Sequence, residues 1–479
     1  MEVADAETVF NFLGKRYEDA YADSPNLKSV MQDALTRIRP GSRVLDVGCG
    51  TGEPVASMLA AAGHSVYGID VAEEMIKIAR LQVPGRFEKA DMRTYTPPHK
   101  FGAVFVIYSL FQISPSETHG VVYRFAEWLE DDGVMILGVM PSTSLESSQV
   151  KSGELLRDKT WDCVRWMKKP WMTRVTNETF LSEQGWQDLL QSAGFTVEEE
   201  SLFEFTPKDK EHTTPEHHYL IVARKNARCH PLLGPYPFPE SHLSPQIRHS
   251  SAWKELQSRF TFDDGQNIVL DVLKRSATIL DVGQGLGFAG LEIAPGIIAA
   301  KTTKIFLDPS GNLPFGGQSF DAVIAISTLE YANDVEKSVR ELARVTNAAN
   351  PLACIMIFQA APESEAQRLL SSNCAPLSTQ NKTRHQGHLL HSAGKVLSET
   401  GFAQISMQRV NGHFKFSDSQ LPRQCHQAAE ALASLQYRED PNYAQMKEAL
   451  IPQLQLLFQD HPNIIRHELA VLIARPLAN

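Results

Sequence analysis

A glycine-rich pattern that occurs twice in the chain is the feature that most constrains its fold. RVLDVGCGTG spans residues 43–52 and TILDVGQGLG spans residues 278–287, and in each an apolar run leads into closely spaced glycines. An apolar strand that ends in a glycine turn and continues into a helix is typical of the start of an α/β unit. Matching apolar runs follow both copies, at 101–110 and at 320–329. The repeat therefore predicts two α/β domains in tandem.

The central strands of both predicted domains are nearly continuous apolar runs, such as VFVIYSL and VIAIS. Such runs are expected of parallel strands that helices cover on both faces. We therefore expect a doubly wound, Rossmann-like sheet in each domain, with ligands beyond the carboxyl ends of the strands. The predicted divisions are a first domain at 1–225, a proline-rich linker at 226–245 and a second domain at 246–479. Trp253, Phe260 and Phe262 are expected on a helix that opens the second domain.

Composition argues against several classes of partner. The formal net charge of -10 at pH 7 opposes binding to a phosphate backbone, so no nucleic-acid partner is expected. No run of eighteen or more apolar residues occurs and the N-terminal segment is acidic, which predicts no membrane partner and a cytoplasmic location. The six cysteines form no CxxC pair, which is typical of reduced thiols, and no metal site is expected.

The first glycine turn combines an accessible backbone with a carboxylate. Gly48, Gly50 and Gly52 alternate along the turn, and Asp46 lies two residues before them. Glycines allow close approach to a ligand and positive φ angles, and the helix that follows offers free N–H groups to an anionic end such as a carboxylate. A dinucleotide-binding turn is the alternative. The spacing GxGxG in place of GxGxxG disfavours it, and Asp46 would repel a pyrophosphate but attract an ammonium group.

Two further acids follow this turn at the ends of predicted strands. Asp70 ends the run SVYGID, where a carboxylate can accept both hydroxyl groups of a ribose. Asp91 follows FEKA and precedes Met92, a pair suited to the edge and face of an adenine. Together VLDVGCGTG, GID and DM resemble the cofactor motifs of class I S-adenosylmethionine (SAM)-dependent methyltransferases.

The resemblance implies an enzyme with two Rossmann-like methyltransferase domains, with SAM as cofactor and S-adenosylhomocysteine (SAH) as product. It implies that Asp46, Gly48 and Gly50 line the methionine part, Asp70 the ribose, and Asp91 with Met92 the adenine. The residues expected at the cofactor are Tyr17, Tyr21, Asp46, Gly48, Cys49, Gly50, Gly52, Asp70, Val71, Asp91, Met92 and Ile107. The whole chain also resembles the tandem-domain methyltransferases of fungal natural-product pathways, which include makers of carboxylate methyl esters and a peptide N-methyltransferase.

Tyr17 and Tyr21 are four residues apart and so share one face of a helix. Ordinary aromatic packing is one interpretation. In the family that the chain resembles, an N-terminal helix often closes over the cofactor, and a tyrosine there can face the sulfonium through cation–π attraction.

The second copy keeps Asp281, Gly283, Gly285 and Gly287, but Gln284 takes the place of a cysteine. Asp308 follows Asp281 by 27 residues, against 24 between Asp46 and Asp70, and we match it to the ribose acid. About nineteen residues are then missing before the next strand, roughly one helix and one short edge strand. A second alignment deletes the ribose strand instead. Under either alignment a cofactor subsite is lost, so the second domain is predicted to be a pseudo-enzyme scaffold.

The acceptor side of the first domain is less constrained by the sequence. The strand that ends in IYSLFQI lacks the Asn/Asp-Pro-Pro-Tyr/Phe motif of nucleic-acid methyltransferases, which again favours a small-molecule substrate. Tyr108, Gln112 and His217 are candidate catalytic residues, although a dedicated base is not required, and His217 with His218 could instead be surface residues. In the excursion 141–180 the candidate substrate residues are Trp161, Arg165, Trp166 and Arg174. A packed helix with a solvated basic face is the alternative for this segment.

The leading hypothesis is O-methylation of a small carboxylic acid or phenol in secondary metabolism. The alternatives are N-methylation of an amino acid or short peptide, and a SAM-binding regulator without catalysis.

The helical insertion expected at 417–466 either forms a lid or completes the core of the second domain. The expected assembly is a monomer with an intrachain pseudo-dimer, or a homodimer.

Overall fold

The computed structural model describes residues 2–145, 153–239, 250–263, 271, 273–283, 301–305, 307–308, 310–379 and 384–477. The chain divides into two compact units, Met1–Pro231 (unit 1) and Leu232–Asn479 (unit 2). Among the residues described, no helix combines the length and the apolar character that crossing a membrane requires.

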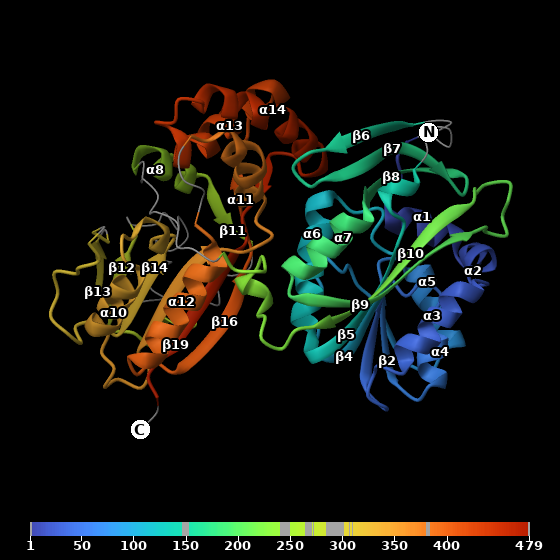
Figure 1. The fold of residues 1–479 in the computed structure, drawn as a ribbon, viewed down its shortest axis with the longest axis horizontal. Helices are drawn as coiled ribbons and strands as arrows, with labels where there is room; N and C mark the ends of the chain where they lie inside the picture. The colour runs from blue at the N-terminus through green and yellow to red at the C-terminus, as the bar shows by residue number, and fades with distance from the viewer. Residues whose placement is uncertain are drawn as a thin grey trace. The chain divides into compact units, whose positions relative to one another are not determined.

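Unit 1 is built on a seven-stranded sheet (Figure 1). In spatial order its strands are β3 (Arg86–Lys89), β2 (Ser65–Asp70), β1 (Arg43–Val47), β4 (Phe101–Ile107), β5 (Leu129–Val139), β10 (Glu216–Lys225) and β9 (Phe195–Phe205). β10 is antiparallel to both of its neighbours, and the five strands from β3 to β5 are parallel. The chain leaves β1 toward β2 and returns on the other side through β4. This switch point is where ligands bind in open α/β sheets.

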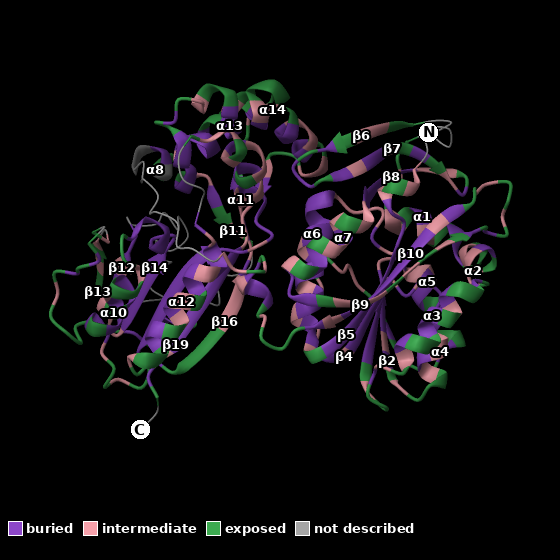
Figure 2. Ribbon diagram, viewed as in Figure 1, coloured by how far each residue is buried: buried purple, intermediate pink, exposed green. Residues whose placement is uncertain are grey.

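Helices cover both faces of this sheet. Helices α3 (Pro25–Leu35), α4 (Val55–Ala61) and α5 (Glu73–Gln82) pack on one face, and α6 (Pro115–Trp128) and α7 (Glu183–Ser192) pack on the other. Because both faces are covered, the central strands are buried along most of their length, as the purple strands in Figure 2 show. The predicted doubly wound α/β fold is confirmed.

The excursion after β5 is a three-stranded antiparallel sheet. Its strands are β6 (Glu154–Asp158), β7 (Cys163–Trp171) and β8 (Arg174–Leu181). The alternative of a packed basic helix for this segment is therefore wrong. Met172 and Thr173 join β7 to β8 at positive φ angles of 45° and 67°. The tip of this hairpin packs against the N-terminal helices.

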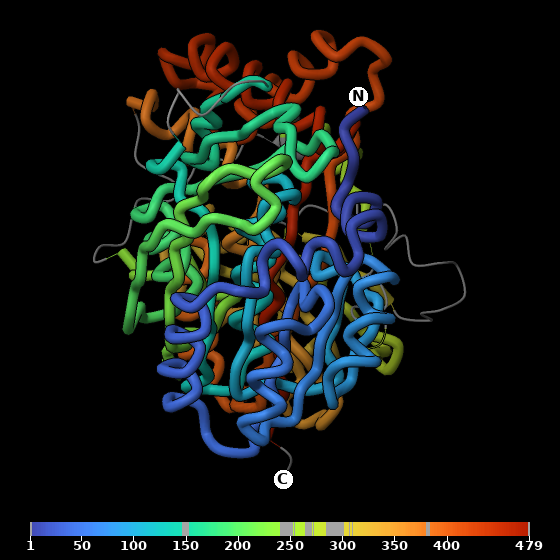
Figure 3. Tube along the Cα trace, turned by 90° about the vertical axis from the view of Figure 1, so that its right-hand side faces the viewer, coloured from blue at the N-terminus to red at the C-terminus, as the bar shows by residue number. Residues whose placement is uncertain are grey.

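Two short helices at the N-terminus, α1 (Ala6–Leu13) and α2 (Lys15–Tyr21), lie beside the glycine turn (dark blue in Figure 3). Asp5 caps α1 by accepting a hydrogen bond from the Thr8 N–H at 2.8 Å. Gly14 separates the helices at a φ of 49°. The apolar residues of both helices cluster with Met172 and Trp171 at the hairpin tip.

Unit 2 repeats the sheet with one strand fewer. In spatial order its strands are β13 (Lys301–Ile305), β12 (Thr278–Val282), β14 (Ala322–Ile326), β15 (Cys354–Ala360), β19 (Leu469–Arg475) and β16 (Gln404–Val410). β13 pairs with β12 as β2 pairs with β1, and the described residues between β13 and β14 form neither a helix nor another strand of this sheet. The prediction that an edge strand and its helix are missing is confirmed. The alternative alignment, which deletes the second strand, is wrong.

The strand register corrects the match of Asp308 to Asp70. Val47 lies opposite Ile69, and Asp70 is the residue after Ile69. In unit 2 Val282 lies opposite Ile305, and Asp308 comes three residues after Ile305. Asp308 is therefore two positions too far along the chain, and it is exposed. Gln284, Gly285 and Gly287 lie outside the described residues.

The other described helices and strands of unit 2 pack on the two faces of this sheet. One face is covered by the helices α10 (Val335–Val345) and α12 (Gln386–Glu399). The other is covered by the helices α8 (Ser250–Ser258), α11 (Glu365–Leu369), α13 (Leu421–Tyr437) and α14 (Tyr443–Asp460), with the strands β11 (Phe260–Phe262), β17 (Gly412–Lys415) and β18 (Ile464–Arg466). Trp253 lies on α8, but Phe260 and Phe262 lie on β11, which corrects their expected place on the opening helix. An alternating Phe-Thr-Phe triplet suits a strand that buries one face.

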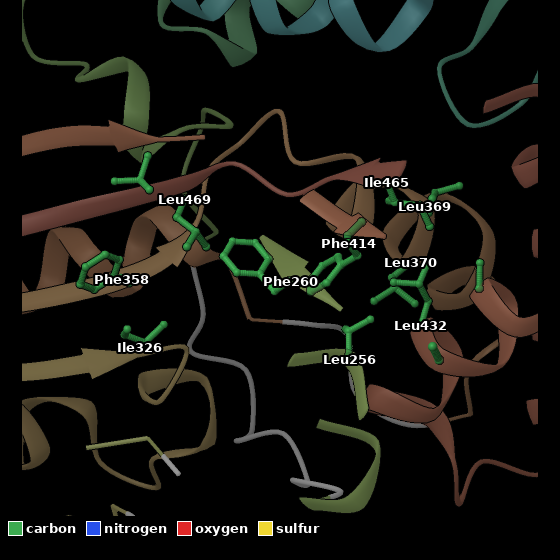
Figure 4. Packing of buried hydrophobic residues seen from close by; sticks show 14 of the residues in the cluster. Leu256, Phe260, Ile326, Phe358, Leu369, Leu370, Phe414, Leu432, Ile465 and Leu469 are labelled. Atoms are coloured by element: carbon green, nitrogen blue, oxygen red, sulfur yellow. The ribbon is translucent and has the colours of Figure 1, made fainter. Parts of the chain in front are cut away.

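The helical insertion α13–α14 buries its apolar side within unit 2. Leu432 shares one hydrophobic cluster with Phe260, Phe358 and Phe414 (Figure 4). Met446 and Leu450 of α14 are fully buried in the same cluster. Of the two interpretations from the sequence, completion of the core of the second domain is the one that these contacts support.

Candidate active site

The first glycine turn leaves β1 with every glycine at a positive φ angle. The φ angles are 70° at Gly48, 52° at Gly50 and 87° at Gly52, a region that residues with a Cβ rarely adopt. A Cβ added to Gly48 would lie 2.3 Å from the Cβ of Ser109. The N–H groups of Gly48 and Cys49 both donate to the Ile69 carbonyl, at 2.8 and 3.0 Å. The turn is thus held against the end of β2, where Asp70 lies.

Asp70 is buried and spans the turn with both carboxylate oxygens. Its Oδ2 accepts from the Gly50 N–H at 2.9 Å, and its Oδ1 accepts from the Ala72 N–H at 2.8 Å. Burial raises the pKa of Asp70, although the hydrogen bonds from Ala72 and Gly50 oppose that rise. Each oxygen keeps a further lone pair for a ligand hydroxyl.

Asp46 lies beneath the turn and is only 2 % exposed. Its Oδ2 makes no hydrogen bond with the described residues. Burial, and to a lesser extent the nearby Asp70, raise the pKa of Asp46 to about 8. A buried carboxyl oxygen without a described partner fits the ammonium of the amino-acid end of SAM, since an arriving ammonium would supply the missing partner.

A cleft of about 210 Å³ opens beside the turn. Of the residues expected at the cofactor it is lined by Tyr17, Gly48, Gly50, Asp70, Val71, Asp91, Met92 and Ile107. Asp46, Cys49 and Gly52 do not line this cleft, and Tyr21 lines the neighbouring chamber instead. The structure thus brings most of the expected set together around one cavity.

Arg93 is a cleft residue that the sequence analysis did not single out. Its guanidinium holds the Asp91 carboxylate through Nε and Nη2, and its Nη1 reaches Glu117 at 3.0 Å. Burial raises the pKa of Asp91, but the hydrogen bonds from Arg93 outweigh that effect, so the net shift is downward. Arg93 thereby fixes the orientation of Asp91 at the cleft wall.

A smaller chamber of about 60 Å³ adjoins the cleft. The two cavities share Tyr17, Tyr108 and Gln112, together with Ala6, Phe10 and Ser109. Tyr108 follows β4 at a φ of 55°, and its backbone N–H donates to the Gly138 carbonyl at 2.8 Å. The buried Tyr108 hydroxyl and Gln112 Oε1 have no hydrogen-bond partner among the described residues, so both are available to a ligand.

Glu216, at the start of β10, is the chamber residue that the sequence analysis missed. Its Oε1 accepts from the Tyr21 hydroxyl at 2.8 Å, and its Oε2 lies 3.1 Å from Nε2 of His218. Trp171 Nε1 donates to the Tyr21 hydroxyl at 3.0 Å. Residues 216 and 218 share one face of a strand because side chains alternate with a period of two. That spacing in EHH was the available signal, and it selects His218 over His217 for the chamber.

The candidate substrate residues do not gather at one place. Trp166, Arg174 and His217 line an outer cavity of about 340 Å³, which shares Met140, Lys169, Trp171 and Glu216 with the chamber. Trp161 instead packs on His119, and Arg165 lies 3.9 Å from Asp158 in a buried pair. Neither Trp161 nor Arg165 lines the cleft, the chamber or the outer cavity.

Comparison with known proteins bears on both units. Residues 44–133 match a family model described as a methyltransferase domain, and residues 280–350 match a second model with the same description. A 27-O-demethylrifamycin SV methyltransferase from Amycolatopsis mediterranei (strain S699) is 32 % identical over 160 residues, which cover 27 % of this chain and 58 % of that protein. A putative methyltransferase from Geobacillus sp. (strain WCH70) is 34 % identical over 104 residues, 20 % of this chain and 42 % of that protein. The chain thus spans about half the length of these curated relatives.

Solved structures with a similar fold include further methyltransferases. One is the magnesium protoporphyrin IX methyltransferase of Synechocystis PCC 6803 with bound SAM, at 17 % identity and a TM-score of 0.33, covering 47 % of this chain and 99 % of that one. Another is a SAM-dependent methyltransferase from Clostridium acetobutylicum ATCC 824, at 13 % identity and a TM-score of 0.34, covering 46 % and 99 %. The two family models thus identify a segment of each unit as a methyltransferase domain, and both curated relatives are methyltransferases by name.

Proposed function

We propose that unit 1 transfers the methyl group of SAM to a small molecule that reaches the inner chamber. The observation that carries the proposal is the continuity of the cleft and the chamber across Tyr17, Tyr108 and Gln112. A donor in the cleft and an acceptor in the chamber would meet at these three residues, and methyl transfer requires such an in-line approach in a site that excludes water.

The cleft residues divide the cofactor among them in this proposal. Asp46 and the glycine turn hold the amino-acid end, Asp70 the ribose, and Asp91 with Met92 the adenine. When bound, SAM supplies an electrophilic methyl group on a sulfonium. Tyr17 lines both cavities and would orient that end of the cofactor toward the chamber.

The carboxylate in the chamber lining favours some classes of acceptor over others. A carboxylic acid would enter as an anion, and the buried Glu216 carboxylate would repel it. A phenol or an amine carries a proton that a carboxylate can accept, so Glu216 favours acceptors of this kind. O-methylation of a phenol and N-methylation of an amine therefore both fit the chamber better than formation of a methyl ester.

The division of labour between the units is part of the same proposal. Unit 2 would serve as a scaffold without a cofactor of its own, because Asp308 is out of register with Asp70 and the segment that corresponds to β3 is missing from its described residues. The resemblance to fungal tandem-domain enzymes, a secondary metabolite as substrate and a cytoplasmic location also remain proposals.

The test is a methyl-transfer assay with isotopically labelled SAM and a panel of phenols, amines and carboxylic acids, with SAH formation as the readout. We expect SAH to accumulate only with an acceptor, and Asp70→Ala to abolish this activity. A protein that binds SAM tightly but methylates no member of the panel would favour the alternative of a SAM-binding regulator.

A further inference from the structure

The chamber holds a carboxylate, Glu216, that contacts neither a lysine nor an arginine among the residues the structure describes. We propose that Glu216 binds the ammonium group of an amine acceptor inside an aromatic box and takes its proton before methyl transfer. This inference rests on the proposed methyltransferase function and assigns its substrate class as a primary or secondary amine.

Charge accounting within the chamber supports a cationic ligand. Lys169 lines the chamber, but its Nζ donates to Glu178 Oε2 at 2.7 Å, so the charges of these two side chains compensate each other. Glu216 is 8 % exposed, and its two hydrogen-bond partners are a phenol hydroxyl and an imidazole. A buried carboxylate held by a hydroxyl and an imidazole, with no lysine or arginine among its described partners, can gain a charge-assisted hydrogen bond from an arriving ammonium.

Aromatic rings surround this carboxylate. Tyr17 and Tyr21 stack with centroids 5.0 Å apart, and Phe10 lies 5.3 Å from Tyr17 and 5.9 Å from Trp171. Trp171 lies 6.1 Å from Tyr21. Ring faces around an acid attract organic cations through cation–π interaction, whereas a carboxylate ligand would meet repulsion from both features.

Beside Glu216, a ring nitrogen of His218 has no hydrogen-bond partner among the described residues, which suits a site that accepts a proton. His218 is 2 % exposed, and its Nε2 faces Glu216, which assigns the proton to Nε2 and leaves Nδ1 without a partner among the described residues. In the proposed step the ammonium R–NH3+ gives one proton to the Glu216 carboxylate and becomes R–NH2. The nitrogen lone pair then forms the N–CH3 bond as the S–CH3 bond breaks. The electron pair of that bond stays on sulfur, so the products are R–NH2–CH3+ and SAH.

Cavity sizes indicate the shape of the acceptor. The chamber, at about 60 Å³, has room for a small head group. The outer cavity, at about 340 Å³, shares Trp171 and Glu216 with it and can hold a longer tail. The acceptor is thus an amine at the end of a larger molecule.

The experiment is calorimetric titration of the full-length protein, saturated with SAH, with four small probes. Benzylamine, benzyl alcohol and benzoate have similar shapes and differ in charge, and phenol represents the other acceptor class. The test variant is Glu216→Gln. The matched control is Glu204→Gln, since Glu204 is an exposed glutamate on β9, opposite His217 and outside the three cavities.

We expect benzylamine to bind at least tenfold more tightly than benzyl alcohol or phenol, and benzoate to bind most weakly. Glu216→Gln should remove the tenfold preference for benzylamine, and Glu204→Gln should keep it. The proposal is overturned if phenol or benzoate binds most tightly, if none of the probes binds, or if the preference survives Glu216→Gln. If that variant no longer binds SAH, the order of the four probes on the unaltered protein decides. Failure of the unaltered protein to bind SAH refutes the proposed function instead.

Discussion

Replacing Asp70 with alanine should weaken cofactor binding by about two orders of magnitude. Both carboxylate oxygens already accept one backbone N–H, from Gly50 and from Ala72, and each retains a lone pair for one ribose hydroxyl. A hydrogen bond to a charged group contributes about 1.5 kcal/mol at the lower end of the usual range. Two such bonds amount to about 3 kcal/mol, which corresponds to roughly 150-fold in Kd.

The same substitution should also destabilise the free protein, because the Gly50 and Ala72 N–H groups lose their acceptor. Leaving a buried donor unpaired costs about 1–3 kcal/mol. Asp70→Asn separates the two effects, since its amide oxygen can still accept one backbone hydrogen bond while the charge is removed. Urea unfolding of the unliganded proteins measures the structural part, and titration with SAH measures the binding part.

The matched control is Asp308→Ala, which removes the exposed carboxylate that the sequence spacing matches to the ribose acid in unit 2. The full-length protein should bind one SAH per chain, with unchanged affinity in Asp308→Ala. Two sites per chain, or a loss of binding in Asp308→Ala, would refute the division between a catalytic unit and a scaffold. A change of less than tenfold in Asp70→Ala would refute the assignment of Asp70 to the ribose.

Three further predictions concern the turn and the acid beneath it. Gly48→Ala and Gly41→Ala both place alanine at a φ near 70°, but only the Cβ at Gly48 would collide, at 2.3 Å from Ser109. We expect Gly41→Ala to cost about 1 kcal/mol of unfolding free energy and Gly48→Ala about 1–3 kcal/mol more, with loss of SAH binding; equal stabilities in urea titration would contradict this. Asp46, with its pKa raised to about 8, is mostly protonated at pH 7, and the ammonium of SAH should lower that pKa, so binding should release close to one proton. The apparent enthalpy of SAH binding should then differ between phosphate and Tris buffers at pH 7, and Asp46→Asn should remove the difference. The unliganded protein should also lose stability as pH rises from about 4 to about 8, because the folded state keeps a proton on Asp46 that the unfolded state has lost, and Asp46→Asn should flatten this slope; a slope that Asp46→Asn leaves unchanged would contradict the assignment.

The architecture was predictable because it is carried by local pattern. Continuous apolar runs and the repeated glycine turn predict parallel strands, and the shortened spacing between Asp308 and the next strand identified a missing edge strand. The position of Asp308 relative to the paired strands was not predictable. A loop that is a few residues longer or shorter moves an acid out of register while the sequence motif looks the same. The sequence also did not decide between a helix and strands for residues 163–181, because a mixture of aromatic and basic residues at short range fits either structure.

The cofactor side of the candidate site was easier to predict than the acceptor side for a physical reason. Most cofactor residues lie within or shortly after the strands β1, β2, β3 and β4, so sequence order fixes their place. The chamber instead joins Tyr21, Trp171 and Glu216, which are far apart in the sequence and meet only through packing of α2 on the β7–β8 hairpin. No local pattern encodes such a meeting, which is why the sequence did not point to Glu216 and why Trp161, expected at the substrate, lies outside the three cavities.

The proposed role of unit 2 as a scaffold links the loss of two cofactor subsites to the edge of its sheet. In unit 1, β2 is an interior strand with the sequence SVYGID, and it is covered by β3. Its counterpart β13 is itself the edge strand, has the sequence KTTKI and is largely exposed. Lysines on an edge strand prevent pairing with another chain, so Lys301 and Lys304 fit a sheet that ends at this strand. The segment that carries Asp91 and the acid at the end of β2 both belong to this edge in unit 1. In the proposed scaffold, a sheet that ends at β13 would lose the adenine and the ribose contacts together, while the central strands that support the fold remain.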